Sequence, residues 1–284
     1  MNTTMNTVNQ IFDWSRFTAT LRKEVVENWR AILFTMIGTF GLLTMIMIMG
    51  NFIGSDSDSM RGEMINYTKV PQKVVFGMLS MAAIVVASLS FRKLTTKSGR
   101  IDMFTSPSST LEKFVVNGVV YVLGYIVVFF ILAQLADLTR IGVMHAIGYD
   151  DDIPGPINFL NTTGDVIMGI GSSFFNGPWA QVYIWSSLLA TPGLYLLGSI
   201  VWPRLSLLKT FAAVYAVEFV LGIVFVISVF IFGDWEDLGM WIFNKMDMFV
   251  PFLTILVIIE AIVAWSLAWY LFKRKDVISL KWWK

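Results

Sequence analysis

The chain has 284 residues, of which 56% are hydrophobic and 14% are charged, whereas soluble domains carry about 25% charged residues. This composition excludes an ordinary soluble globular protein, and the absence of cysteine excludes disulfides, thiolate metal sites and cysteine nucleophiles. A single histidine, His145, leaves little room for histidine-based catalysis or metal binding. The sequence predicts an all-α polytopic integral membrane protein, because lipid offers the backbone no hydrogen-bond partners.

Residues 1–30 predict a cytoplasmic amphipathic helix that lies in the membrane surface. Its apolar side chains recur at three- and four-residue steps with charges between them, at Ile11, Trp14, Phe17, Leu21, Val25 and Trp29. The charged residues and the lack of a compact apolar core argue against a secretory signal. An alternative is a helix that only precedes the first span and packs on the protein.

Six apolar runs follow, each close to the roughly 20 helical residues that cross a hydrocarbon layer about 30 Å thick. They form a six-helix transmembrane domain over residues 31–272, followed by a basic cytoplasmic tail at 273–284. The predicted spans are about 31–49, 74–91, 114–136, 179–202, 210–232 and 248–272. The uncharged stretch from Val166 to Phe175 is too short for a crossing, and we expect it to be interfacial or re-entrant.

The positions of lysine and arginine orient these spans. The segments 1–30, 92–113, 203–209 and 273–284 hold four, five, two and five basic residues, which is 16 of the 21 in the chain. The segments on the opposite side are acidic overall. This split predicts that both termini lie in the cytoplasm.

The first cytoplasmic loop, Arg92 to Lys113, combines a basic lead-in with a helix-start signal. Pro107 disrupts any earlier helix, and Ser109 with Glu112 three residues later is a capping-box pattern. We therefore expect a short structured element rather than a tether. The alternative is that the basic residues only set the topology and the capping box only begins the next helix.

Two external segments are also distinctive. The loop from Asp137 to Pro178 contains the triplet Asp150-Asp151-Asp152 close to His145, and carboxylates can bind a divalent cation. Adjacent carboxylates cannot all face one ion, so a solvated loop is the favoured interpretation. The segment from Gly233 to Asp247 mixes tryptophans with acidic residues, which is typical of an interfacial hairpin or half-helix between the last two spans.

Glu218 and Glu260 interrupt the fifth and sixth predicted spans. An ionised carboxylate within hydrocarbon is costly, so such residues are candidates for a polar path or for a proton or cation site. The alternative is that they are protonated, or bonded to a neighbouring helix, and only hold the bundle together. Asn117 and Gln134 in the third span are candidate hydrogen-bond partners.

The sequence contains no phosphate-binding loop, serine-nucleophile elbow or zinc-protease motif. We expect no catalytic residue, no cofactor, no metal site and no nucleic-acid partner. The chain is therefore not expected to be an enzyme, nor to hydrolyse ATP itself.

The order of these parts resembles the membrane subunits of type-2 ATP-binding-cassette exporters. Those permeases have an amphipathic elbow helix, here Ile11 to Trp29, six spans with both ends inside, and an inserted hairpin, here Gly233 to Asp247. A short helix in their first cytoplasmic loop, here Ser109 to Phe114, docks on a separate ATPase. The stretch SFRKLTTKSGRIDMFTSPSSTLEKF is also similar to a segment of small permease-like membrane proteins of Bacteroidetes.

The resemblance implies a bacterial cytoplasmic (inner) membrane, a separate cytoplasmic ATPase subunit, and a homodimer or a heterodimer with a similar permease. The residues it assigns to ATPase docking are Arg92, Lys93, Lys97, Arg100, Ser109, Glu112, Lys113 and Phe114. Two other functions stay open. One is a secondary carrier or ion pathway that uses Glu218 and Glu260, and the other is a non-transporting scaffold or sensor with its acidic external loop as the recognition surface.

Overall fold

The computed structural model describes residues 12–54, 66–148, 155–157, 159, 178–232 and 246–275. This part of the chain is helical and contains no strand, so the predicted all-α class is confirmed. The helices are α1 (Trp14–Gly54), α2 (Asn66–Leu89), η2 (Arg92–Thr95), α3 (Lys97–Thr105), α4 (Thr110–Gly118), η3 (Val119–Gly124), α5 (Tyr125–Ile147), α7 (Pro178–Val201), α8 (Ser206–Phe232) and α10 (Met246–Lys273).

Five helical segments of the described chain are long and apolar enough to cross a membrane, which indicates a multi-pass membrane protein. They are Trp14–Met49, Thr110–Ile147, Pro178–Val201, Ser206–Ser228 and Val250–Lys273. In α2 the described apolar stretch is shorter, Val74–Leu89. The sixth span, the location of the termini and the surface helix therefore stay predictions.

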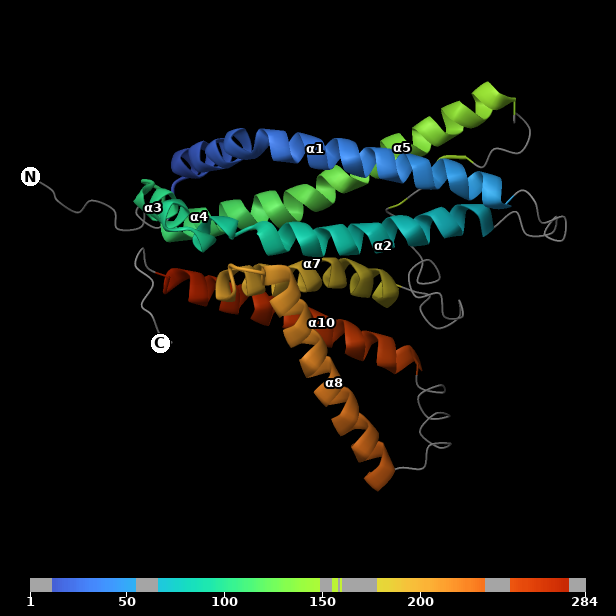
Figure 1. The fold of residues 1–284 in the computed structure, drawn as a ribbon. Helices are drawn as coiled ribbons and strands as arrows, with labels where there is room; N and C mark the ends of the chain where they lie inside the picture. Colours follow the sequence, from blue (N-terminus) through green and yellow to red (C-terminus); the bar gives the residue numbers. More distant parts are fainter. Residues whose placement is uncertain are drawn as a thin grey trace, which may run out of the picture.

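The long helices form an elongated bundle, and one of them leaves it (Figure 1). α1 packs along α5, and α7 packs against both α10 and α2. The core between them is built from large apolar side chains such as Leu79, Phe129 and Leu196, all almost fully buried. α8 contacts α7 and α2 near its start and then diverges from the other helices (Figure 1).

The predicted surface helix and the predicted first span are joined in one helix, α1. No glycine or proline lies between Trp14 and Ile37, so nothing interrupts the backbone hydrogen-bond ladder there. With 41 residues at about 1.5 Å each, α1 is roughly twice as long as a hydrocarbon layer is thick. Its charged first half therefore extends beyond a single span and lies over α3 and α4 at one end of the bundle (Figure 1).

The prediction that a loop begins at Asp137 is wrong, because α5 continues to Ile147 and ends at Gly148, whose φ of 90° is left-handed. Two charged residues remain in the helix because they satisfy each other. Arg140 Nε donates to Asp137 Oδ1 over 2.8 Å, and both side chains are buried. Asp137 Oδ2 also accepts from the backbone N–H of Ile157 over 2.7 Å, which attaches a distant segment to α5.

Several predicted features lie outside the described residues. These are the stretch Val166–Phe175, the triplet Asp150–Asp152, the hairpin segment up to Lys245, and the tail beyond Lys275.

Candidate functional site

The predicted first cytoplasmic loop is folded, as the sequence predicts, into η2 and α3. The Thr96 side chain accepts a hydrogen bond from the N–H of Gly99 over 3.1 Å and so begins α3. Gly99 is required by space, because a Cβ there would collide with the carbonyl oxygen of Lys93. The start of α3 and its junction with η2 are therefore fixed by local contacts.

The predicted capping box at the start of α4 is confirmed. Glu112 Oε2 accepts from the Ser109 N–H over 2.8 Å, and Ser109 Oγ accepts from the Glu112 N–H over 3.2 Å. Glu112 also reaches α1, because its Oε1 accepts from the Asp13 N–H over 2.8 Å and lies 3.2 Å from Arg16 Nη2. This carboxylate is fully buried, and it joins the beginnings of α1 and α4.

A second connection joins η2 to α1 through Lys93. Its Nζ donates to Glu24 Oε2 over 2.6 Å and to Glu27 Oε2 over 2.8 Å, and Tyr121 donates its hydroxyl to Glu24 Oε1 over 3.1 Å. Burial of Lys93 disfavours its ammonium, but the hydrogen bonds that it donates to Glu24 and Glu27 outweigh this, and the pKa of Lys93 is raised.

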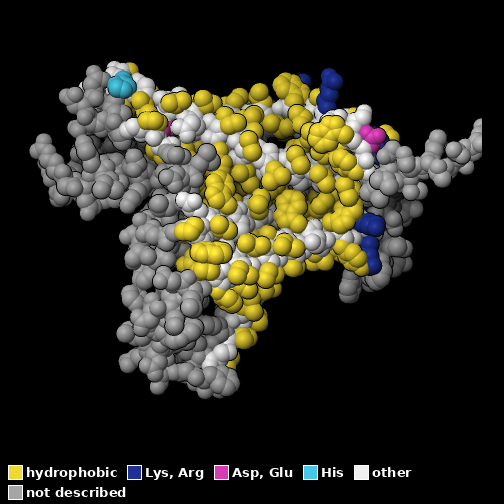
Figure 2. Space-filling view, turned by 180° about the vertical axis from the view of Figure 1, so that it is seen from behind, with side chains coloured by type: hydrophobic (Ala, Val, Ile, Leu, Met, Phe, Trp, Pro, Cys, Tyr) yellow, Lys and Arg dark blue, Asp and Glu magenta, His cyan; other side chains and the backbone are white. Residues whose placement is uncertain are grey.

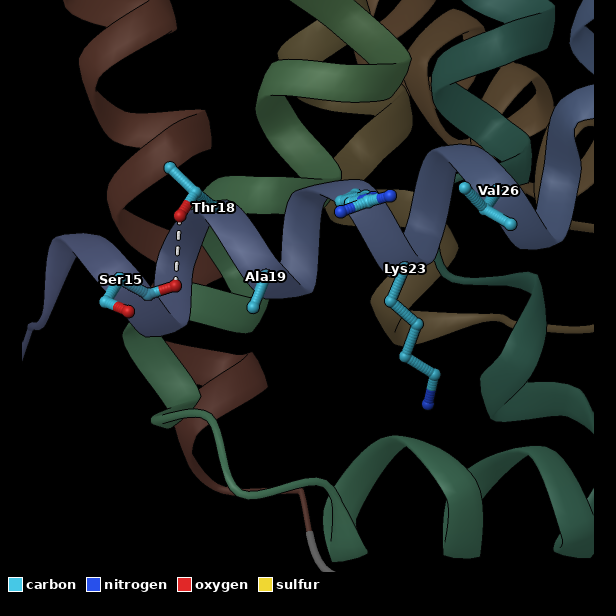
Figure 3. Close-up of a pocket in the computed structure, with 6 residues that line it drawn as sticks. Ser15, Thr18, Ala19, Lys23 and Val26 are labelled. Atoms are coloured by element: carbon cyan, nitrogen blue, oxygen red, sulfur yellow. Dashed lines mark hydrogen bonds between the residues drawn. The ribbon is translucent and has the colours of Figure 1, made fainter.

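A third connection joins α3 to α1 on the more exposed side. Lys23 Nζ lies 3.0 Å from Asp102 and 3.5 Å from Glu27. Figure 3 shows Lys23 extending out of α1 beside a shallow, open hollow that is lined by Ser15, Thr18, Ala19, Arg22 and Val26. We call the ion pairs Arg16–Glu112, Lys93–Glu24, Lys93–Glu27 and Lys23–Asp102 the clamp.

Three of the predicted docking residues lie inside the protein. Glu112 is buried in the clamp, and Lys113 is only 7% exposed, with its Nζ donating to the carbonyl oxygens of Ser106 (3.1 Å) and Phe104 (3.5 Å). Burial lowers the pKa of Lys113.

Phe114 packs in an aromatic cluster with Phe91, Trp265, Trp269 and Phe272. These residues hold the loop in place and present no docking surface of their own.

The outer surface of the loop is basic. Arg92 and Lys97 are exposed, and Arg100 is half-buried beside Lys275 from the end of α10. Burial lowers the pKa of Lys275, and the nearby Arg100 lowers it further. We call Arg92, Lys97, Arg100 and Lys275 the basic face. Figure 2 shows Lys and Arg side chains near one end of a surface that is otherwise largely hydrophobic.

The two glutamates that interrupt the predicted fifth and sixth spans lie on α8 and α10. Glu218 lies 12 residues after the first residue of α8, and Glu260 lies 13 residues before the last residue of α10. Along the helix axes these separations correspond to similar depths of about 18 and 20 Å. Both glutamates are exposed on the surface of the single chain.

The candidate partners from the third span do not reach these glutamates. Asn117 donates to the carbonyl oxygen of Lys113 over 2.8 Å, which is a bond within its own helix. Gln134 lies half-buried on α5. Within the described ranges, no hydrogen bond joins either residue to Glu218 or Glu260.

One contact was missed from the sequence. The indole of Trp265 lies between Gly118 and Gly193, where an added Cβ would come within 2.8 Å and 2.7 Å of its ring. Trp265 Nε1 also donates to the Leu189 carbonyl oxygen over 3.2 Å. In the sequence, only Gly118, Gly193 and the adjacent Pro192 indicate a close helix contact here. A glycine does not indicate which side chain packs against it, so Trp265 could not be identified.

The described residues contain no group of three or more His, Cys, Asp or Glu side chains placed to hold a metal ion. Comparison with family models, curated proteins and solved structures finds no match to this chain.

Proposed function

We propose that this chain is a permease-like membrane subunit of an ATP-binding-cassette transporter, an exporter driven by a separate cytoplasmic ATPase. In this proposal it crosses a bacterial cytoplasmic membrane six times, with both termini inside. The observation that carries the proposal is the folded segment η2–α3, the predicted first cytoplasmic loop, which the clamp attaches to the long apolar helices. A separate motor can move the spans only through an element that is rigidly attached to them.

The clamp attaches η2 and α3 to α1, and it attaches α1 to α4. Lys93 and Asp102 connect η2 and α3 to α1, and Glu112 connects α1 to α4. Because α4 continues through η3 into α5, and α1 continues into its own apolar half, a displacement of α3 is passed to two long helices. Buried and charge-assisted hydrogen bonds such as those of Glu112 are the least compliant of these links.

The basic face is the docking surface in this proposal, and it selects an acidic surface on the ATPase. Arg92, Lys97 and Arg100 keep the docking role that the resemblance assigned to them, and Lys275 is added. The exposed Trp14, Val25, Val26 and Trp29 on α1 support contact of its first half with lipid headgroups. A second permease chain, identical or similar, completes the transporter.

The test is affinity purification of the chain from native membranes in mild detergent, followed by ATPase assay and identification of bound proteins. We expect an ATPase to co-purify with the wild-type chain, and the double variant Arg92→Glu/Lys97→Glu to lose it. Arg204→Glu, an exposed charge in the other cytoplasmic turn, is the matched control and should retain the ATPase. If no ATPase accompanies the wild-type chain, the proposal fails.

A second candidate is a secondary carrier or ion pathway, and the similar depths of Glu218 and Glu260 favour it. Two carboxyl groups at one depth could share or exchange a proton if α8 and α10 approach each other. In vesicles that contain only this chain, this function predicts transport driven by a proton or ion gradient and abolished by Glu218→Gln together with Glu260→Gln. If no flux occurs with either a gradient or an ATPase, the chain is the non-transporting scaffold or sensor.

A further inference from the structure

The turn between α7 and α8 is the most strained part of the described backbone. Leu205, immediately before α8, has a φ of 57°, and it is the only described non-glycine residue with a positive φ. A branched side chain in this region clashes with its own backbone, so the conformation persists only where the surroundings impose it.

The first turns of α8 are also incompletely satisfied. Ser206 and Thr210 are 6% and 4% exposed, and within the described structure neither hydroxyl has a hydrogen-bond partner. Thr210 lies against α7 at Gly198, where a Cβ would overlap its side chain. α8 is therefore attached to the bundle by a tight glycine contact and two unpartnered buried hydroxyls.

Beyond this attachment, α8 has almost no neighbours. It diverges from α7 and α10 in Figure 1, and its large side chains are exposed on all sides, including Phe219, Leu221 and Val224. Glu218 on α8 and Glu260 on α10 lie at similar distances from the first residue of α8 and the last residue of α10, and both are exposed. An exposed carboxyl at this depth in hydrocarbon is unfavourable.

We infer that α8 is a hinged helix that swings about the Trp202–Leu205 turn between the splayed position of this structure and a closed position against α10. In the closed position Leu205 leaves its left-handed conformation, and the Glu218 and Glu260 side chains meet and are bonded to each other as an acid and a carboxylate. Strain at the turn disfavours the splayed position. The exposed, unpaired glutamates also favour the closed position. The hinge does not depend on which function is correct, because a carrier and an ATPase-driven permease both require helices that move.

The absence of cysteine allows a direct test by spin labelling and pulsed electron paramagnetic resonance. Val224→Cys on α8 and Leu256→Cys on α10 lie at about equal depth and are both exposed. Val182→Cys on α7 with Leu256→Cys is the control pair, because α7 and α10 pack together along their length. Labelled chains are diluted with unlabelled ones in lipid bilayers, so that only distances within one chain are measured.

We expect two distances for the α8–α10 pair and one for the control pair. Leu205→Gly removes the strain of the splayed position and should raise its population relative to the closed one about fivefold. Glu218→Leu should deplete the closed population, and Glu218→Gln, which can still bond to Glu260, should retain it. An unchanged control distance shows that each variant is folded.

Two results would overturn the inference. One is a single α8–α10 distance that Leu205→Gly and Glu218→Leu leave unchanged. The other is a short distance between two undiluted chains that each carry only Val224→Cys, accompanied by a single α8–α10 distance. That outcome would mean that a second copy packs on α8 and holds it in the splayed position.

Discussion

Glu112 shows how a residue assigned to an external surface can instead hold the interior together. Its two carboxylate oxygens accept from the backbone of Ser109, three residues before it, and of Asp13, 99 residues before it. The local bond was predictable from the capping-box spacing, because that pattern is contained in four consecutive residues. The bond to Asp13 was not, because nothing in the sequence indicates which distant backbone group meets a buried carboxylate.

Replacing Glu112 by Gln should destabilise the protein by about 1–3 kcal/mol, because one backbone N–H then faces an amide donor instead of an acceptor. The measurement is the free energy of unfolding in detergent, from denaturant titration. Glu27→Gln is the matched control, since its partly exposed ion pairs contribute about 1 kcal/mol or less. Equal losses in the two variants would contradict the assignment of Glu112 as the central link.

Gly118 and Gly193 are the residues at which an added methyl group should be least tolerated. Gly118→Ala and Gly193→Ala each place a Cβ against the Trp265 ring and should cost about 1–3 kcal/mol through overpacking. Gly77→Ala, where no atom lies within 4 Å of the added Cβ, should be neutral or stabilising. Thermal unfolding of the three variants in detergent measures this, and a loss at Gly77 as large as at Gly118 would contradict it.

At the scale of the elements, hydropathy predicted α7, α8 and α10 to within a few residues at each end, because their boundaries coincide with changes in composition. The hydropathy-based prediction failed where two charged side chains form an ion pair within one helix. α5 extends through Asp137 and Arg140 because these side chains neutralise each other, and a scan for uncharged runs stops at the first of them. It also divided α1 in two, because a helix without a breaker continues across a change from charged to apolar sequence.

The attachment of η2 to α1 should weaken in strong alkali. Because the pKa of Lys93 is raised on folding, its contribution to stability is fully present below the unfolded pKa of about 10.5 and is lost as pH rises through the higher folded value. Unfolding measured from pH 8 to 11.5 should show a smaller alkaline loss of stability for Lys93→Met than for the wild type. Lys97→Met, an exposed lysine in the same loop, should follow the wild type, and identical profiles for all three chains would contradict the prediction.

At the scale of the whole molecule, α1 begins and α10 ends at the same end of the bundle as α3 and α4 (Figure 1). In the sequence, 16 of the 21 basic residues fall in the segments 1–30, 92–113, 203–209 and 273–284, and the first two of these include the start of α1 and the whole of α3. Positively charged loops are retained on the cytoplasmic side during insertion, so the charge distribution predicts which end of the bundle faces the cytoplasm. The bundle itself has no such direction, since either end could lie inside.

The absence of cysteine makes this orientation testable with single cysteines and a membrane-impermeant thiol reagent. Ala146→Cys, exposed near the end of α5, should react in intact cells, because that end of the bundle is predicted to lie outside. Ser98→Cys, exposed on α3, should react only after the cells are permeabilised, and the cysteine-free parent should not react at all. The reversed pattern would place α3 outside, where no ATP is available, and would exclude both the orientation and the proposed docking of an ATPase.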